Sequence, residues 1–253
     1  MRHALPLLLL VVGCATSPAP PRAQRRARGP WSPVPAVEMP TGDTSIPIDL
    51  LRDVADALLE LPGAKVCDSV ELRPLVGLST EYCSTVYVAG DRDSLSWRVT
   101  EPIPGDHESC EPSDAVEDDD YPASQVWVVG YVHNHLCGSS PSSRDLALWP
   151  RGPFNAYVAM AEVRLIPSNG QSGDLVPAVY KNTGIDMASA IVAERQDGTR
   201  VYLRYFTTGE VEQWSAARAG WVSLGTCAPR QPDSRNRPRT PQCSPEPLQL
   251  LRE

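Results

Sequence analysis

The chain has 253 residues, a formal net charge of −8 at pH 7, 26 prolines, seven cysteines and only four histidines. The acidic balance argues against a nucleic-acid partner, because surfaces that bind nucleic acid cluster Lys and Arg against phosphate. The length is ample for one domain with a buried core.

The N-terminal segment has the features of an export signal. Arg2 and His3 form a short basic start, and the apolar stretch 4–12 is far shorter than the ~20 residues that span a bilayer. Residues 11–14, Val-Val-Gly-Cys, resemble a bacterial lipobox, which implies cleavage before Cys14 and acylation of its thiol. The alternative is an ordinary signal peptide with a chance cysteine. Since Ala15 rather than Asp follows Cys14, the resemblance to Gram-negative lipoproteins favours a lipid-anchored protein of the outer membrane.

The remaining chain divides into a tether, a domain and a tail. Residues 14–45 are rich in Pro and Arg and read as an extended tether. The domain is expected over 46–228, beginning with a helix over 48–61 that has apolar residues at helical spacing and ends at Pro62-Gly63. The Pro-rich tail 229–253 is expected to be mobile except where Cys243 fixes it.

A hairpin is predicted after this helix, with strands over 81–88 and 94–99 joined by an Ala-Gly-Asp turn. The region 104–122 follows and contains the acidic run 117–120. Such a run is typical of a solvated loop.

Two histidines come directly after the apolar run 125–132, which reads as a buried strand. Strand side chains alternate between faces, so His133 and His135 share a face with Cα atoms roughly 6.6 Å apart. Asp145, ten residues after His135, can supply a third ligand once the loop folds back. Three protein ligands with an open fourth position describe a catalytic zinc site.

Simpler interpretations exist for the same residues. Each histidine could be a core residue satisfied by hydrogen bonds. Ser142 and Asp145 precede an apolar stretch at the spacing of a helix capping box, which explains both without a metal.

His-x-His, a short loop and Ser-x-x-Asp together resemble the JAMM motif of the MPN+ (JAB domain) metalloproteases. In that family the two histidines and the aspartate bind one Zn²⁺, the serine stabilises the reacting centre, and an upstream glutamate deprotonates the metal-bound water. By resemblance, the metal ligands are His133, His135 and Asp145, and the motif serine is Ser142. The chain departs from the family pattern at Leu136, where proline is usual, and in a His-to-Ser loop that is one residue short.

The resemblance also implies the general base and the fold. Glu81, which opens the first hairpin strand, is favoured as the base, with Glu71 as the alternative. The implied fold is α/β: a single MPN/JAB-like, cytidine-deaminase-like domain with a mixed sheet flanked by helices. Further strands are predicted over 157–163, 175–180, 191–193 and 200–206, and short helices over 146–149 and 213–219.

Six cysteines remain besides Cys14, and an even number in an exported protein suggests up to three disulfides with 15 possible pairings. They are Cys67, Cys83, Cys110, Cys137, Cys227 and Cys243. Cys227 with Cys243 is a plausible local closure. Cys137 could be a thiolate ligand, although a disulfide to Cys110 that pins the motif loop is favoured.

The function expected from the motif is a zinc-dependent peptidase or isopeptidase that hydrolyses amide bonds in the bacterial cell envelope. Its partners are then a peptide or protein substrate and, through the N-terminal lipid, a membrane. The alternative is a non-catalytic envelope lipoprotein that uses an MPN-like scaffold to bind a partner.

Overall fold

The computed structural model describes residues 26–39, 45–91, 94–138, 140–147, 166–167, 187–231, 233–234 and 240–252. The signal segment, Cys14 and the strands predicted over 157–163 and 175–180 lie outside the described residues. Within the described part of the chain, no helix is both long and apolar enough to cross a membrane.

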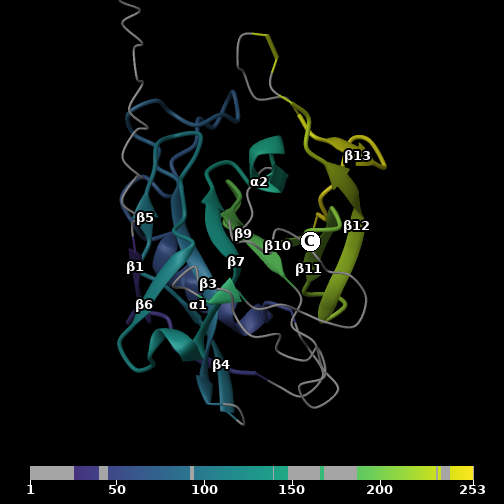
Figure 1. Cartoon of the computed structure of the whole chain (residues 1–253). Helices are drawn as coiled ribbons and strands as arrows, with labels where there is room; N and C mark the ends of the chain where they lie inside the picture. The colour runs from purple at the N-terminus through teal and green to yellow at the C-terminus, as the bar shows by residue number, and fades with distance from the viewer. Residues whose placement is uncertain are drawn as a thin grey trace, which may run out of the picture.

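The described residues form mostly β-structure (Figure 1). The elements in chain order are β1 (Arg26–Gly29), β2 (Val37–Glu38), α1 (Ile48–Leu58), β3 (Tyr82–Asp91), β4 (Ser94–Val99), β5 (Ile103–Pro104), β6 (Ala115–Asp118), η1 (Ala123–Gln125), β7 (Val126–His135), α2 (Ser143–Ala147), β8 (Ile166–Pro167), β9 (Ala188–Glu194), β10 (Arg200–Phe206), β11 (Glu210–Ser215), β12 (Gly220–Ala228) and β13 (Gln242–Ser244).

One 11-stranded sheet dominates the molecule, with the order β13-β12-β11-β10-β9-β7-β3-β4-β2 and with β5 and β8 pairing β3 and β7. β7 and β9 are parallel, whereas the other pairs of this sheet are antiparallel. Two antiparallel halves therefore meet at β7, the strand that carries both histidines. β1 and β6 form a separate parallel pair.

Helix α1 covers one face of this sheet. Its buried side chains recur at helical spacing, namely Leu50, Leu51, Val54, Ala55 and Leu58. They join a core cluster with Val86 of β3, Val132 of β7 and Val192 of β9. The opposite face carries a second cluster, in which Leu146 of α2 packs with residues of β9, β10 and β11. In Figure 1, α2 lies at the upper end of the sheet, where β7 ends.

The expected helix-flanked α/β fold is wrong, because the described protein is mostly β with two helices of 11 and five residues. The helix predicted over 213–219 is wrong, because residues 213–215 belong to β11 and a turn follows them. The side chains of β11 alternate between partly exposed and buried. A period of two is typical of a strand. In the sequence, the polar residues of the segment obscure this alternation. β12 and β13 then extend the sheet as a meander.

Several local predictions are confirmed. The helix predicted over 48–61 is α1, which ends at Leu58, and the hairpin strands correspond to β3 and β4. The strand over 200–206 is β10 with the same bounds.

The described fold extends beyond 46–228 at both ends. Trp31 and Val34, from the expected tether, belong to the main core with 8% and 4% of their surfaces exposed. Leu248 and Leu250 pack against the second core cluster. The Leu251 backbone N–H donates to Gln213 Oε1 at 2.8 Å, so the end of the tail is held against β11.

The acidic run is only partly a solvated loop: Asp119 and Asp120 follow β6 with exposed side chains, whereas Asp118 is a buried residue of the strand. Asp118 ends β6 and its side chain is fully buried. Its carboxylate accepts the Tyr87 hydroxyl at 2.5 Å and pairs with Arg98 at 3.2 Å. The carboxylate is stable there because both partners replace the water that it loses.

Candidate metal centre

Strand β7 and helix α2 bring three metal-ligating side chains together. His133 and His135 end β7 and are each 5% exposed. Asp145 of α2 lies between them, with Oδ1 3.3 Å from His133 Nε2 and Oδ2 3.3 Å from His135 Nε2. One ligand atom from each residue lies within 4.8 Å of the other two. His133, His135 and Asp145 form a group that could hold a metal ion.

The two distances of 3.3 Å from Asp145 to the histidines, each to a different carboxylate oxygen, are close to those expected around a small tetrahedral ion. With metal–ligand bonds of roughly 2.0–2.2 Å, neighbouring ligand atoms in a tetrahedral site lie about 3.3–3.6 Å apart. In addition, the buried Nε2 atom of His133 has no hydrogen-bond partner among the described residues, although Asp145 is close. A buried polar atom without a partner is costly, and a cation between the imidazole and the carboxylate would satisfy it.

Asp145 is oriented by the helix that it caps. The Ser142 backbone N–H donates to Asp145 Oδ2 at 2.6 Å, and the Asp145 N–H donates to Ser142 Oγ at 3.2 Å. This is a reciprocal capping box at the start of α2. The capping interpretation and the ligand interpretation therefore hold together, because the box aims the carboxylate at the two imidazoles.

The charge state of Asp145 suits a metal ligand. Burial by itself raises the pKa of this carboxyl, but the two neighbouring imidazoles outweigh that effect and hold its pKa well below the usual range. Asp145 is therefore a carboxylate at neutral pH.

Glu81 lies in the same pocket as His133 and Asp145, whereas Glu71 does not. Glu81 is 9% exposed, and its backbone is fixed by a hydrogen bond from its N–H to Asp106 O at 2.7 Å. Burial raises the pKa of the Glu81 carboxyl, and the two imidazoles oppose that shift. The side chain of Glu71 is 57% exposed and pairs with Arg73. Of the two glutamates, only Glu81 is placed to serve the site.

Asn134, between the two histidines, points to the other side of β7 and fixes the start of β3. Its amide donates to Ala64 O at 2.5 Å and Thr80 O at 3.1 Å, and its carbonyl oxygen accepts the Tyr82 N–H at 2.7 Å. Because Glu81 stands between Thr80 and Tyr82, Asn134 fixes the backbone on both sides of Glu81. Sequence reasoning missed this role, although alternation along β7 could have separated it from the histidines.

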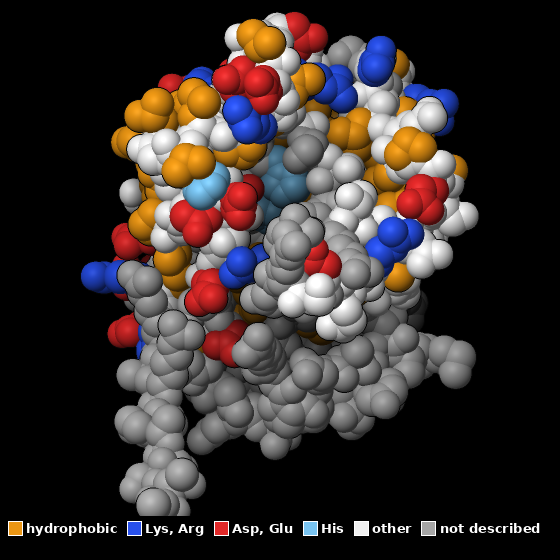
Figure 2. All heavy atoms as spheres, turned by 90° about the horizontal axis from the view of Figure 1, so that it is seen from above, with side chains coloured by type: hydrophobic (Ala, Val, Ile, Leu, Met, Phe, Trp, Pro, Cys, Tyr) orange, Lys and Arg blue, Asp and Glu red, His pale blue; other side chains and the backbone are white. Residues whose placement is uncertain are grey.

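The pocket contains residues that the motif did not indicate. Tyr131, Tyr205, Ser109 and Arg144 line it together with Glu81, His133 and Asp145. Tyr131 was accessible to sequence reasoning, since it is two residues before His133 on the same strand. Ser142 is absent from this lining but abuts it through Asp145. Figure 2 shows histidine side chains in a hollow of this face, with acidic and hydrophobic side chains around it.

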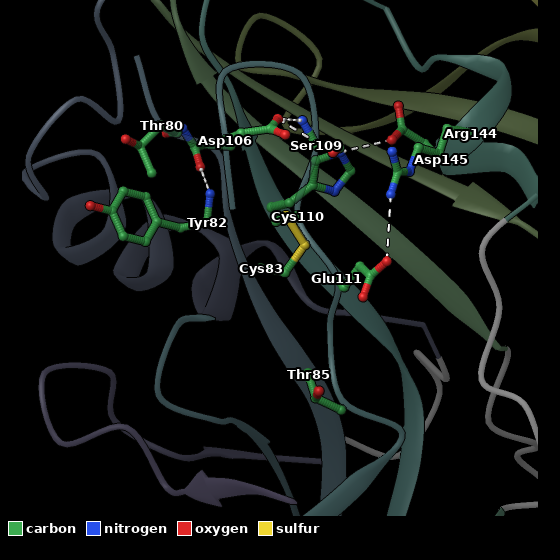
Figure 3. Close-up of a disulfide and its surroundings, with 12 residues drawn as sticks. Thr80, Tyr82, Cys83, Thr85, Asp106, Ser109, Cys110, Glu111, Arg144 and Asp145 are labelled. Carbon is green, nitrogen blue, oxygen red and sulfur yellow. Dashed lines mark hydrogen bonds and ion pairs between the residues drawn. A yellow bond between two sulfur atoms is a disulfide. The ribbon is translucent and has the colours of Figure 1, made fainter. Parts of the chain in front are cut away.

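The described residues contain three disulfides: Cys67–Cys137, Cys83–Cys110 and Cys227–Cys243. The Cys227–Cys243 pairing is confirmed, and the Cys110–Cys137 pairing is wrong. Cys137 is no thiolate ligand, because its sulfur is bonded to Cys67, but it does pin the chain two residues after His135. Cys83 lies opposite His133 in the β3–β7 register, so its disulfide forms one wall of the pocket (Figure 3).

No family model, curated protein or solved structure gives a significant match to this chain.

Proposed function

We propose that this protein is a zinc-dependent amide hydrolase, acting as a peptidase or isopeptidase of the bacterial cell envelope. The observation that carries the proposal is the convergence of His133, His135 and Asp145 on one point, with the buried Glu81 in the same pocket. The order of these residues also resembles the JAMM motif.

Zinc is the ion that this donor set fits best. Two imidazole nitrogens and one carboxylate are typical ligands of catalytic zinc, which keeps an open fourth position. Magnesium and calcium prefer six or more oxygen ligands, which these three side chains do not provide. When bound, zinc would lower the pKa of a water molecule and polarise the substrate carbonyl.

The side chains around the ligands supply the proton transfers. Glu81 accepts a proton from the attacking water and returns it to the leaving amine. Its burial strengthens this role, because a poorly solvated carboxylate is a better base than an exposed one. The Ser142 hydroxyl accepts the Asp145 N–H, which leaves its own proton free to donate to the developing oxyanion.

The proposed location in the envelope rests on the resemblance of residues 11–14 to a lipobox. Lipid on that cysteine, followed by the chain up to β1, would hold the site near a membrane surface, where the substrate is a peptide or protein. The three disulfides are consistent with an oxidising compartment.

Metal content provides the first test. The purified protein is expected to hold about one zinc per chain, and a His133→Ala, His135→Ala double variant is expected to lose it, because only Asp145 then remains of the group. Metal analysis after dialysis measures this directly. His107→Ala is the matched control, since His107 lies outside the ligand group. A wild-type protein that neither contains nor takes up zinc contradicts the proposal.

Glu81→Gln separates catalysis from partner binding. The amide keeps the shape of Glu81 but cannot accept the proton, so hydrolysis of a peptide-library substrate should fall by at least about 100-fold. Zinc content should not change, because Glu81 is not in the ligand group. A zinc protein without measurable hydrolysis in either form instead favours the alternative, a metal-stabilised envelope scaffold. The capping role of the Ser142 hydroxyl is compatible with that alternative.

A further inference from the structure

The pocket of the metal centre has an uneven distribution of charge. Glu81 and Asp145 contribute carboxylates, and His133 lines the pocket as a candidate metal ligand. Arg144 is the one Lys or Arg among the described residues that line the pocket. Arg144 precedes Asp145 in α2, so its backbone is fixed by the same capping box that orients the ligand.

Arg144 reaches across the mouth of the pocket toward Glu111 (Figure 3). Arg144 Nη2 lies 3.8 Å from Glu111 Oε1, and the side chains of Arg144 and Glu111 are 52% and 71% exposed. Glu111 follows Cys110, whose disulfide to Cys83 fixes the opposite wall. Such a long and exposed ion pair contributes little stability, so a better anion can displace Glu111 at small cost.

We propose that Arg144 binds a carboxylate of the substrate, so that the enzyme prefers amides with a free carboxylate close to the scissile bond, such as the last peptide bond before a C-terminus. A guanidinium forms two parallel hydrogen bonds with a carboxylate, which is stronger and more selective than its contact with Glu111. This inference rests on the proposed function, because a zinc ion held by His133, His135 and Asp145 would polarise the scissile carbonyl while Arg144 binds the anion.

The probe is a set of paired hydroxamates, which bind zinc through the hydroxamate group. Each pair carries a terminal carboxylate or the uncharged carboxamide, joined through two, three or four methylene groups. Isothermal titration into the zinc-loaded protein is expected to show about tenfold tighter binding of the acid than of the carboxamide at the best length. Arg144→Gln is expected to abolish this preference, whereas Glu111→Gln is expected to increase it, because the competing carboxylate is gone.

Arg73→Gln is the matched control, since Arg73 forms a similar exposed pair with Glu71 outside the pocket. It should keep the wild-type preference. If the zinc-loaded wild type binds acid and carboxamide equally, or if Arg144→Gln retains the preference, this inference is overturned while the metal centre stands. A protein without zinc overturns the proposed function itself, so the two failures are distinguishable.

Discussion

At His133, Asn134 and His135, neighbouring side chains on one strand perform two different tasks. The histidines face Asp145, while the amide of Asn134 faces away and joins three backbone groups at the entry to β3. Glu81 thus reaches the pocket because a residue of the ligand strand holds its flanking peptides. Hydrogen bonds from Asn134 therefore connect the strand of the two histidines to the backbone on both sides of Glu81.

Asn134→Ala is expected to lower the free energy of unfolding by about 3 kcal/mol, because it leaves buried backbone groups at Ala64, Thr80 and Tyr82 without their partner. Urea unfolding with intact disulfides measures this. Gln125→Ala removes an amide at the other end of β7, whose bond to Asp91 is exposed, and should change stability little. If Asn134→Ala lowers the free energy of unfolding by less than ~1 kcal/mol, the prediction is wrong and water replaces the amide as hydrogen-bond partner.

At the scale of elements, β6 is held to the sheet by charge as well as by apolar contact. Val116 packs with Tyr87 and Val128, while Asp118 binds the Tyr87 hydroxyl and Arg98. Arg98 also pairs with Asp120 at 2.7 Å. The acidic sequence therefore attaches β6 to the sheet, because the buried Arg98 pairs with the carboxylates of Asp118 and Asp120.

Asp118→Asn is expected to destabilise the protein by about 3 kcal/mol, since it leaves the Arg98 charge with one partner fewer in a buried site. Thermal unfolding of the protein with its disulfides intact measures the resulting change in melting temperature. Asp119→Asn is the neighbouring control, because Asp119 forms an exposed pair with Arg28 and should leave the melting temperature nearly unchanged. Equal effects of the two substitutions would argue against a buried anchor.

For the whole molecule, α1, β3, β4 and β10 were predictable because each has a clear local pattern of apolar residues. The fold class was not, because it depends on which strands pair. β7 meets β9 across more than fifty residues of sequence, and no local pattern encodes that contact. The contribution of the segments around Trp31 and Leu250 was likewise hidden, since Pro-rich stretches read as tethers although their few apolar residues pack into the core.

The sequence by itself determined the candidate ligand group, because the period of a strand puts His133 and His135 on one face and the spacing of a capping box orients Asp145. Only the tertiary structure decided between Glu81 and Glu71, paired Cys67 with Cys137, and placed Arg144 at the mouth of the pocket opposite Glu111. The physical reason is range: dihedral preferences act over a few residues, whereas burial and pairing depend on segments that meet only when the chain folds.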